Sequence, residues 1–84
     1  MHYLYIVECS DGSLYTGIAK DIQTRLDQHN AGKGARYTRS RRPVRLVYSE
    51  IYETWGDALR REHQIKTWPR SKKIALIESK DKKS

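Results

Sequence analysis

The 84-residue sequence predicts one small α+β domain. Two observations indicate this class. Short segments rich in Tyr, Ile and Val lie near the N-terminus and in the middle of the chain, as is typical of strands. Segments with a helical spacing of apolar residues follow capping residues such as Asp and Thr. The predicted order is strand, strand, helix, strand, helix, helix. We expect the domain to span residues 1–79, with residues 80–84 as a frayed basic tail.

The first 18 residues predict a β-hairpin. Residues 2–9 and 13–18 are rich in aromatic and β-branched side chains, and the Ser-Asp-Gly sequence at residues 10–12 is typical of a turn. A two-residue loop would place Tyr5 and Tyr15 on opposite faces of the hairpin. A three-residue loop, with its glycine left-handed, places both on one face. We favour the second register.

This register sets Gly17 opposite Tyr5. A glycine at that position leaves room for a ligand or for a close approach of backbone. The two tyrosines could equally be part of the strand core. Alternatively, their hydroxyls point at a reacting phosphate. A tyrosine with its ordinary pKa of about 10 is a poor base unless a nearby cation lowers that pKa.

The next segment predicts a helix over residues 22–31. Asp21 suits the N-cap position, and Gly32 suits the end of the helix. Arg25 and His29 are four residues apart and therefore share one ridge of the helix. They could form an ordinary solvated face. Alternatively, Arg25 binds a phosphate oxygen in a bidentate manner, and His29 donates or accepts a proton.

Residues 32–43 predict a loop, and residues 44–52 predict a third strand with imperfect alternation. Six positive residues and no acidic residue occur between Lys33 and Arg45. This loop could be only a solubilising surface. A basic loop with one aromatic residue suits a nucleic-acid backbone better, with the aromatic ring available to stack on a base. The expected nucleic-acid contacts are Lys33, Arg36, Tyr37, Arg39, Arg41 and Arg42.

The C-terminal third predicts two helices. Thr54 can cap a helix over residues 55–67, and Ser71 can cap a shorter one over residues 72–78 after the break at Pro69. Glu62 falls within the apolar stripe of the longer helix, which is formed by Trp55, Ala58, Leu59 and Ile65.

A carboxylate on the core side of a helix is costly unless it is paired, hydrogen-bonded or bound to a cation. Glu62 could therefore form a buried salt bridge to an arginine, or accept a hydrogen bond from a tyrosine. Alternatively, it holds a metal ion. One carboxylate, together with water and a substrate phosphate, suits Mg²⁺.

The composition restricts the partners. The chain carries 17 Lys and Arg against 10 Asp and Glu, a net charge of +7, and a polyanion is the natural partner. No segment is long and apolar enough to span a membrane. A single cysteine, Cys9, excludes an internal disulfide and argues against a structural zinc site. We expect a cytoplasmic protein.

The chain resembles the GIY-YIG nuclease superfamily, and in particular its small, single-domain bacterial members. Tyr3-Leu4-Tyr5 stands where the family has Gly-Ile-Tyr, and Tyr15-Thr16-Gly17 stands where it has Tyr-Ile-Gly. Arg25 and His29 match the family arginine and its His/Tyr position. Glu62 resembles the family's metal-binding glutamate. The resemblance covers residues 3–78.

This resemblance implies a three-stranded antiparallel sheet flanked by helices, one divalent metal ion (Mg²⁺ or Mn²⁺), and hydrolysis of phosphodiester bonds in DNA. In that scheme Tyr15 acts as base or positions the attacking water, and Arg25 stabilises charge on the phosphoryl oxygens. Tyr5 and His29 hydrogen-bond water or phosphate, and Glu62 binds the ion. The implied function is an endonuclease of low sequence specificity, of repair or recombination type.

Two positions depart from the family pattern. Ile74 stands where many relatives carry Asn, and Ile18 stands where excision-repair relatives carry Lys. Two other functions therefore remain open. One is a non-catalytic nucleic-acid-binding module. The other is a nuclease subunit that needs a partner chain, which six tyrosines and two tryptophans in so small a protein would suit if some are exposed.

Overall fold

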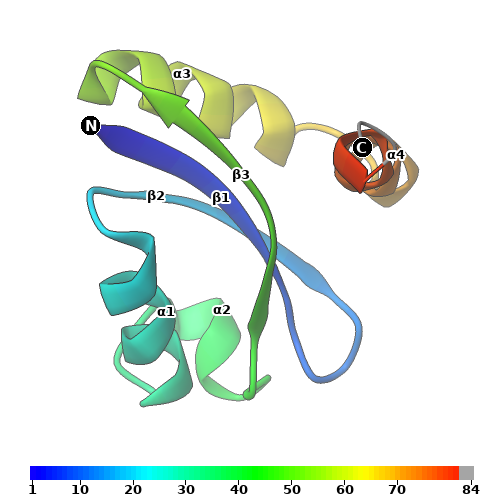
Figure 1. The fold of residues 1–84 in the computed structure, drawn as a ribbon. Helices are drawn as coiled ribbons and strands as arrows, with labels where there is room; N and C mark the ends of the chain where they lie inside the picture. The colour runs from blue at the N-terminus through cyan, green and yellow to red at the C-terminus, as the bar shows by residue number, and fades with distance from the viewer. Residues whose placement is uncertain (82–84) are drawn as a thin grey trace.

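The computed structural model describes residues 1–81, which form a three-stranded antiparallel sheet with helices on both faces. The strand order is β2-β1-β3. Figure 1 shows α1 and α2 on one side of the sheet and α3 and α4 on the other. The elements are β1 His2–Glu8, β2 Leu14–Ala19, α1 Ile22–Asn30, α2 Arg36–Arg39, β3 Arg45–Tyr52, α3 Trp55–Lys66 and α4 Arg70–Asp81. The predicted α+β class and order of strands and longer helices are confirmed.

The central strand β1 builds both halves of the core, because its side chains alternate between the two faces of the sheet. Tyr5 and Val7 pack with residues of α1 on one face. Leu4 and Ile6 pack on the other face, against Ile65 of α3 and apolar residues of α4. These four side chains of β1 are all buried, so the sheet is covered on both sides.

The hairpin has the predicted three-residue register. Gly12 has a φ of +84°, the left-handed conformation that the turn requires. Tyr5 lies opposite Gly17, and Val7 lies opposite Tyr15, so the two tyrosines share a face. The space beside Gly17 is filled by the Tyr5 ring itself, because a Cβ at this glycine would lie 2.5 Å from the Tyr5 hydroxyl oxygen.

The irregular alternation of the third strand has a structural cause. In the pairing of β1 with β3, Ile6 lies opposite Tyr48, whereas Val7 lies opposite Leu46. Val47 is therefore the extra residue of a bulge. Val47 and Tyr48 consequently pack in the same core cluster, although they are consecutive in the chain.

Helix capping agrees with the sequence in two places and differs in one. The Asp21 carboxylate accepts a hydrogen bond from the Thr24 N–H, and the Thr54 hydroxyl accepts one from the Asp57 N–H. The predicted capping role of Ser71 is wrong, because α4 already begins at Arg70. Pro69 precedes the helix, where its missing N–H costs no hydrogen bond.

Three further details correct the sequence-based picture. Part of the predicted loop 32–43 is the short helix α2, which no side chain caps. Trp55, expected in the apolar stripe of α3, is 44% exposed and lies edge-on to the His2 ring. Of that stripe, Ala58 and Ile65 are the fully buried residues. Helix α4 continues to Asp81, beyond the predicted end at residue 78 and into the predicted tail 80–84. Residues 82–84 of that tail lie outside the described part of the chain.

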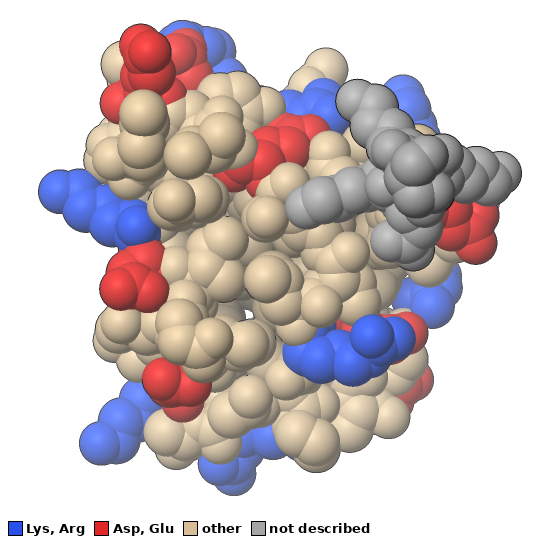
Figure 2. Space-filling view, viewed as in Figure 1, with Lys and Arg blue, Asp and Glu red and all other residues tan. Residues whose placement is uncertain are grey.

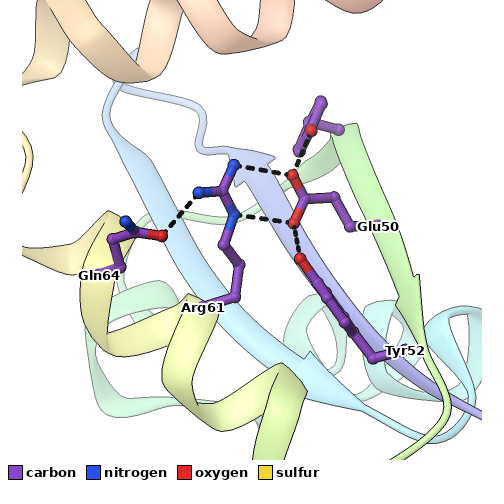
Figure 3. A network of polar contacts seen from close by, with 5 residues as sticks. Glu50, Tyr52, Arg61 and Gln64 are labelled. Carbon is purple, nitrogen blue, oxygen red and sulfur yellow. Dashed lines mark hydrogen bonds and ion pairs between the residues drawn. The ribbon is translucent and has the colours of Figure 1, made fainter.

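A polar network joins β3 to α3. Figure 3 shows the guanidinium of Arg61 facing the carboxylate of Glu50, with Nε–Oε1 and Nη2–Oε2 distances of 3.0 and 3.1 Å. The hydroxyls of Tyr48 and Tyr52 donate to the same carboxylate at 2.5 and 2.6 Å. Burial and then the bonded carboxylate raise the pKa of both tyrosines to about 12. The network holds α3 on the sheet at Arg61, which directly precedes Glu62 in the chain.

No helix among residues 1–81 is long and apolar enough to cross a membrane.

Candidate active site

Four of the five predicted catalytic residues line one open cavity of about 530 Å³. The lining comes from β1, β2, α1 and α3, and includes the exposed Trp55. The predicted residues in it are Tyr5, Tyr15, Arg25 and Glu62. Residues separated by up to 57 positions in the chain therefore meet at one place, next to the edge strand β2.

Tyr5 is the most buried of the four. Its side chain is 2% exposed, and its hydroxyl oxygen lies 2.8 Å from Nε2 of His29. Burial raises the pKa of Tyr5, and the neighbouring Arg25 guanidinium partly offsets this by lowering it. Tyr5 therefore keeps its proton at neutral pH and can donate a hydrogen bond.

His29 lies behind Tyr5 and does not line the cavity. It is fully buried, and its Nδ1 lies 2.7 Å from Oγ1 of Thr38. Burial, and then the positive charge of Arg25, lower the pKa of His29. The ring is therefore neutral at pH 7. His29 is connected to the cavity through its hydrogen bond with Tyr5. The sequence, by contrast, led us to expect that His29 itself donates or accepts a proton in the site.

Tyr15 forms part of a stacked column. Its ring stacks on Tyr37 with the centroids 6.0 Å apart, and Arg41 lies over the Tyr37 ring at 4.1 Å. Tyr37 is 40% exposed, but Tyr15 and Arg41 both contact its ring. Stacking of a base on the Arg41 side would therefore require this arginine to move. The column nevertheless joins the basic segment directly to the cavity.

Glu62 is largely buried, with a side chain that is 12% exposed. Its ion-pair partner among the described residues is Lys66, whose Nζ lies 3.3 Å from Oε2. Neither an arginine nor a tyrosine pairs with it in this part of the chain. The arginine and tyrosine partners considered for Glu62 in the sequence are found instead at Glu50.

The chemistry of the cavity is compatible with one divalent cation. Glu62 supplies a carboxylate beside an open, hydratable space, and Asp21 lines the same cavity. Mg²⁺ is often held by one or two carboxylates with water and substrate phosphate. Within residues 1–81 there is no cluster of three or more His, Cys, Asp or Glu side chains placed to bind a metal. Protein ligands alone therefore do not complete a coordination shell here.

The cationic side chains of the basic segment 33–45 fall into two groups. Some are bonded to other groups of the protein, and the others have no side-chain partner among the described residues. Arg41 pairs with Asp11 at 3.1 Å, Arg42 donates to the Arg39 carbonyl at 2.9 Å, and Arg45 pairs with Glu8. Lys33, Arg36 and Arg39 make no side-chain hydrogen bond or ion pair with the described residues. On the face shown in Figure 2, the cationic side chains lie mainly around the rim.

Thr38 is the main site residue that the sequence did not reveal. It is fully buried in α2 and bonded to His29, nine residues earlier. Gly34 allows this approach, because a Cβ at that position would lie 2.3 Å from Nδ1 of His29. The spacing of Gly34 and Thr38 gave no indication of a contact with His29.

The small antiparallel sheet, and the cavity at which two tyrosines, an arginine and a glutamate meet, agree with the resemblance of the sequence to the GIY-YIG superfamily. Residues 1–75 match the family model of the GIY-YIG catalytic domain. The chain therefore belongs to the GIY-YIG family, a family of nucleases.

Its relatives include short bacterial proteins named UPF0213. Those of Staphylococcus aureus strains Mu3 and N315 are each 60% identical over 79 residues, which cover 94% of this chain and 96% of the relative. The name states no activity, so these relatives support the family rather than a substrate.

Two solution NMR structures resemble this chain. A UPF0213 protein from Bacillus halodurans is 46% identical, with a TM-score of 0.62, over 94% of this chain and 84% of that one. A protein from E. faecalis is 36% identical, with a TM-score of 0.66, over 99% and 88% of the two chains. The sheet and its helices are therefore shared with solved relatives.

Proposed function

We propose that this protein is a divalent-metal-dependent endonuclease that hydrolyses phosphodiester bonds in DNA with low sequence specificity. The observation that carries the proposal is the cavity shared by Tyr5, Tyr15, Arg25 and Glu62. Phosphoryl transfer needs alignment and charge stabilisation more than covalent catalysis, and these residues supply both. We assign the activity to DNA repair or recombination in the cytoplasm.

In this mechanism each residue has a separate task. Arg25 binds a non-bridging phosphate oxygen and stabilises the charge that develops there. Tyr15 orients the attacking water or accepts its proton. Tyr5, which keeps its proton, donates a hydrogen bond to water or phosphate. Glu62 would hold Mg²⁺ or Mn²⁺, and the bound ion would supply Lewis-acid stabilisation.

The basic segment supports a nucleic-acid substrate. Tyr37 stacks on Tyr15, which lines the cavity, so the segment that carries the cations contacts the cavity wall. Lys33, Arg36 and Arg39 are exposed and free of internal partners among residues 1–81, so they are available to bind phosphates of the substrate. Binding should weaken steeply with added salt, because each phosphate contact releases counterions.

The decisive experiment tests a panel of linear, flap and branched DNAs with Mg²⁺ or Mn²⁺. We expect cleavage by the wild-type protein, and loss of cleavage but not of DNA binding in Glu62→Gln and Tyr15→Phe. Glu53→Gln is the matched control, because Glu53 is exposed and does not line the cavity. Cleavage that both substitutions leave unchanged would exclude this mechanism.

A second candidate function is a non-catalytic nucleic-acid-binding module. Ile74 favours it, because many relatives carry a polar Asn at that position, whereas here the side chain is apolar and lies in α4. This candidate predicts salt-dependent DNA binding without hydrolysis under any divalent ion. A single reproducible cut that depends on Glu62 would exclude it.

A further inference from the structure

Three buried polar side chains form a continuous hydrogen-bonded chain from α2 to the cavity. Thr38 Oγ1 lies 2.7 Å from Nδ1 of His29, and Nε2 of the same ring lies 2.8 Å from the Tyr5 hydroxyl. Thr38 and His29 are fully buried, and Tyr5 is 2% exposed. Water therefore has little access to these bonds, and their donors and acceptors must match within the protein.

Two groups that can donate a hydrogen bond lie beside Nδ1 of His29. The first is the Ala35 backbone N–H, at a longer distance of 3.4 Å. The second is the Thr38 hydroxyl, whose other possible acceptor is the Ala35 carbonyl at 3.0 Å. That carbonyl also accepts the Thr38 backbone N–H at 3.2 Å, and its two lone pairs can serve both donors. The Thr38 hydroxyl therefore has two acceptors within reach, and its 2.7 Å contact with Nδ1 is the shorter of the two.

The opposite arrangement leaves a group unpaired. A proton on Nδ1 would face the Ala35 N–H directly, and this backbone donor would lose the ring nitrogen as its acceptor. Loss of the hydrogen-bond partner of a backbone N–H at this part-buried position is unfavourable. Neutral His29 carries one ring proton, so the favoured position for it is Nε2, next to Tyr5.

We infer that Thr38 is a positioning residue that holds His29 in its Nε2–H tautomer, so that His29 donates to the Tyr5 oxygen and the Tyr5 proton is directed into the cavity. The phenol oxygen receives the His29 hydrogen bond on its buried side. The positive charge of Arg25 also lies close to this oxygen. With both donors on the oxygen, the Tyr5 proton is left to point into the cavity that Tyr5 lines.

The consequence for catalysis rests on the proposed function, whereas the tautomer does not. A Tyr5 that accepts a hydrogen bond from His29 presents a fixed hydrogen-bond donor, which suits a phosphate oxygen. With the other tautomer, the Tyr5 hydroxyl would donate its hydrogen bond to His29 and present only lone pairs to an anionic phosphate. Thr38, which does not line the cavity, would thus control the polarity of a group that does.

The tautomer is tested by long-range proton–nitrogen NMR correlations of the His29 ring in the isolated protein, which need neither DNA nor metal. We expect the pattern of an Nε2–H imidazole in the wild-type protein and in Thr38→Ser. In Thr38→Val, which removes the hydroxyl and nearly keeps the shape, we expect a measurable fraction of Nδ1–H. A wild-type ring protonated at Nδ1 would overturn the assignment, and a Thr38→Val ring that stays wholly Nε2–H would overturn the role of Thr38.

The catalytic consequence has its own readout. Loss of one oriented hydrogen bond should lower kcat of Thr38→Val about fivefold with KM nearly unchanged, and Thr38→Ser should restore it. The melting temperature of both variants separates this effect from unfolding. An Nε2–H ring in an inactive protein would support the positioning role and refute the nuclease function. An active Thr38→Val enzyme with wild-type kcat would refute the catalytic consequence alone.

Discussion

The carboxylate of Glu62 and the ammonium of Lys66 form an ion pair of 3.3 Å one helical turn apart on α3. The same ammonium lies 5.6 Å from the centre of the Tyr15 ring. In the proposed function, a divalent ion at Oε2 of Glu62 would therefore compete with the Lys66 ammonium. The Lys66 side chain is 46% exposed, so it can be solvated when displaced.

Removal of Lys66 should therefore tighten metal binding. Because half-exposed ion pairs are worth at most about 1 kcal/mol, we expect Lys66→Gln to raise the affinity for Mn²⁺ by up to about fivefold. Titration calorimetry of the free protein measures this directly. Glu62→Gln should abolish the binding signal. A weaker Mn²⁺ affinity in Lys66→Gln would contradict the competition, and would indicate that Lys66 supports the site.

Gly17 should be essential for the position of Tyr5. A Cβ at residue 17 would lie 2.5 Å from the Tyr5 hydroxyl oxygen and 2.7 Å from Cζ, so Gly17→Ala must displace the ring. Overpacking of this kind costs about 1–3 kcal/mol. We expect a lower melting temperature together with loss of cleavage.

The matched control for this substitution is Gly12→Ala. Gly12 has a φ of +84°, but a Cβ at this position would have no neighbouring atom within 4 Å, so the cost there is backbone strain alone. We expect Gly12→Ala to lower the melting temperature while leaving cleavage of the folded protein unchanged. Equal activity in both variants would show that the position of Tyr5 does not limit catalysis.

The stability of the fold should decrease when the pH falls below about 6.5. Burial and Arg25 lower the pKa of His29 below its ordinary value of 6.5, so below that pH the unfolded chain binds more protons than the folded one. The groups that face His29 are Tyr5, Tyr15, Arg25 and Thr38, and Arg25 is the one that carries charge. The loss begins near pH 6.5 and continues until the pH reaches the folded pKa.

Urea unfolding at about pH 7.5 and about pH 5.5 measures this dependence on either side of the ordinary histidine pKa. His2→Gln is the control, because the pKa of His2 is also lowered. The lowered pKa values of Asp11 and Glu50 act only below their ordinary values of 3.8 and 4.5. A free energy of unfolding that is equal at the two pH values would contradict the buried neutral His29.

The sequence predicted the hairpin well because local chemistry determines it. Loop length and the left-handed preference of Gly12 select the register, and the register decides that Tyr5 and Tyr15 share a face. Asp21 and Thr54 likewise act within three residues of the helix that they cap. Such contacts follow from spacing alone, so they could be predicted before the structure.

The contacts that could not be predicted depend on long-range packing. Thr38 meets His29 only because Gly34 lets the chain pass close to the imidazole. Glu50 and Glu62 look alike in sequence, since each is an acid within an apolar pattern. The fold decides that Glu50 receives Arg61 and two tyrosines, whereas Glu62 is left with a displaceable lysine beside the cavity.

The Glu50–Arg61 pair should affect both stability and metal binding, because Arg61 directly precedes Glu62 on α3. The two side chains are 18% and 23% exposed and share two hydrogen bonds, so Glu50→Gln should lower the free energy of unfolding by about 1.5–3 kcal/mol. The loosened anchorage of α3 should also weaken Mn²⁺ binding in the folded protein. Asp57→Asn, which breaks the exposed Asp57–Arg60 pair on the same helix, is the control and should change either quantity little. A Glu50→Gln protein that is destabilised but binds Mn²⁺ with wild-type affinity would show that the network stabilises the fold without positioning Glu62.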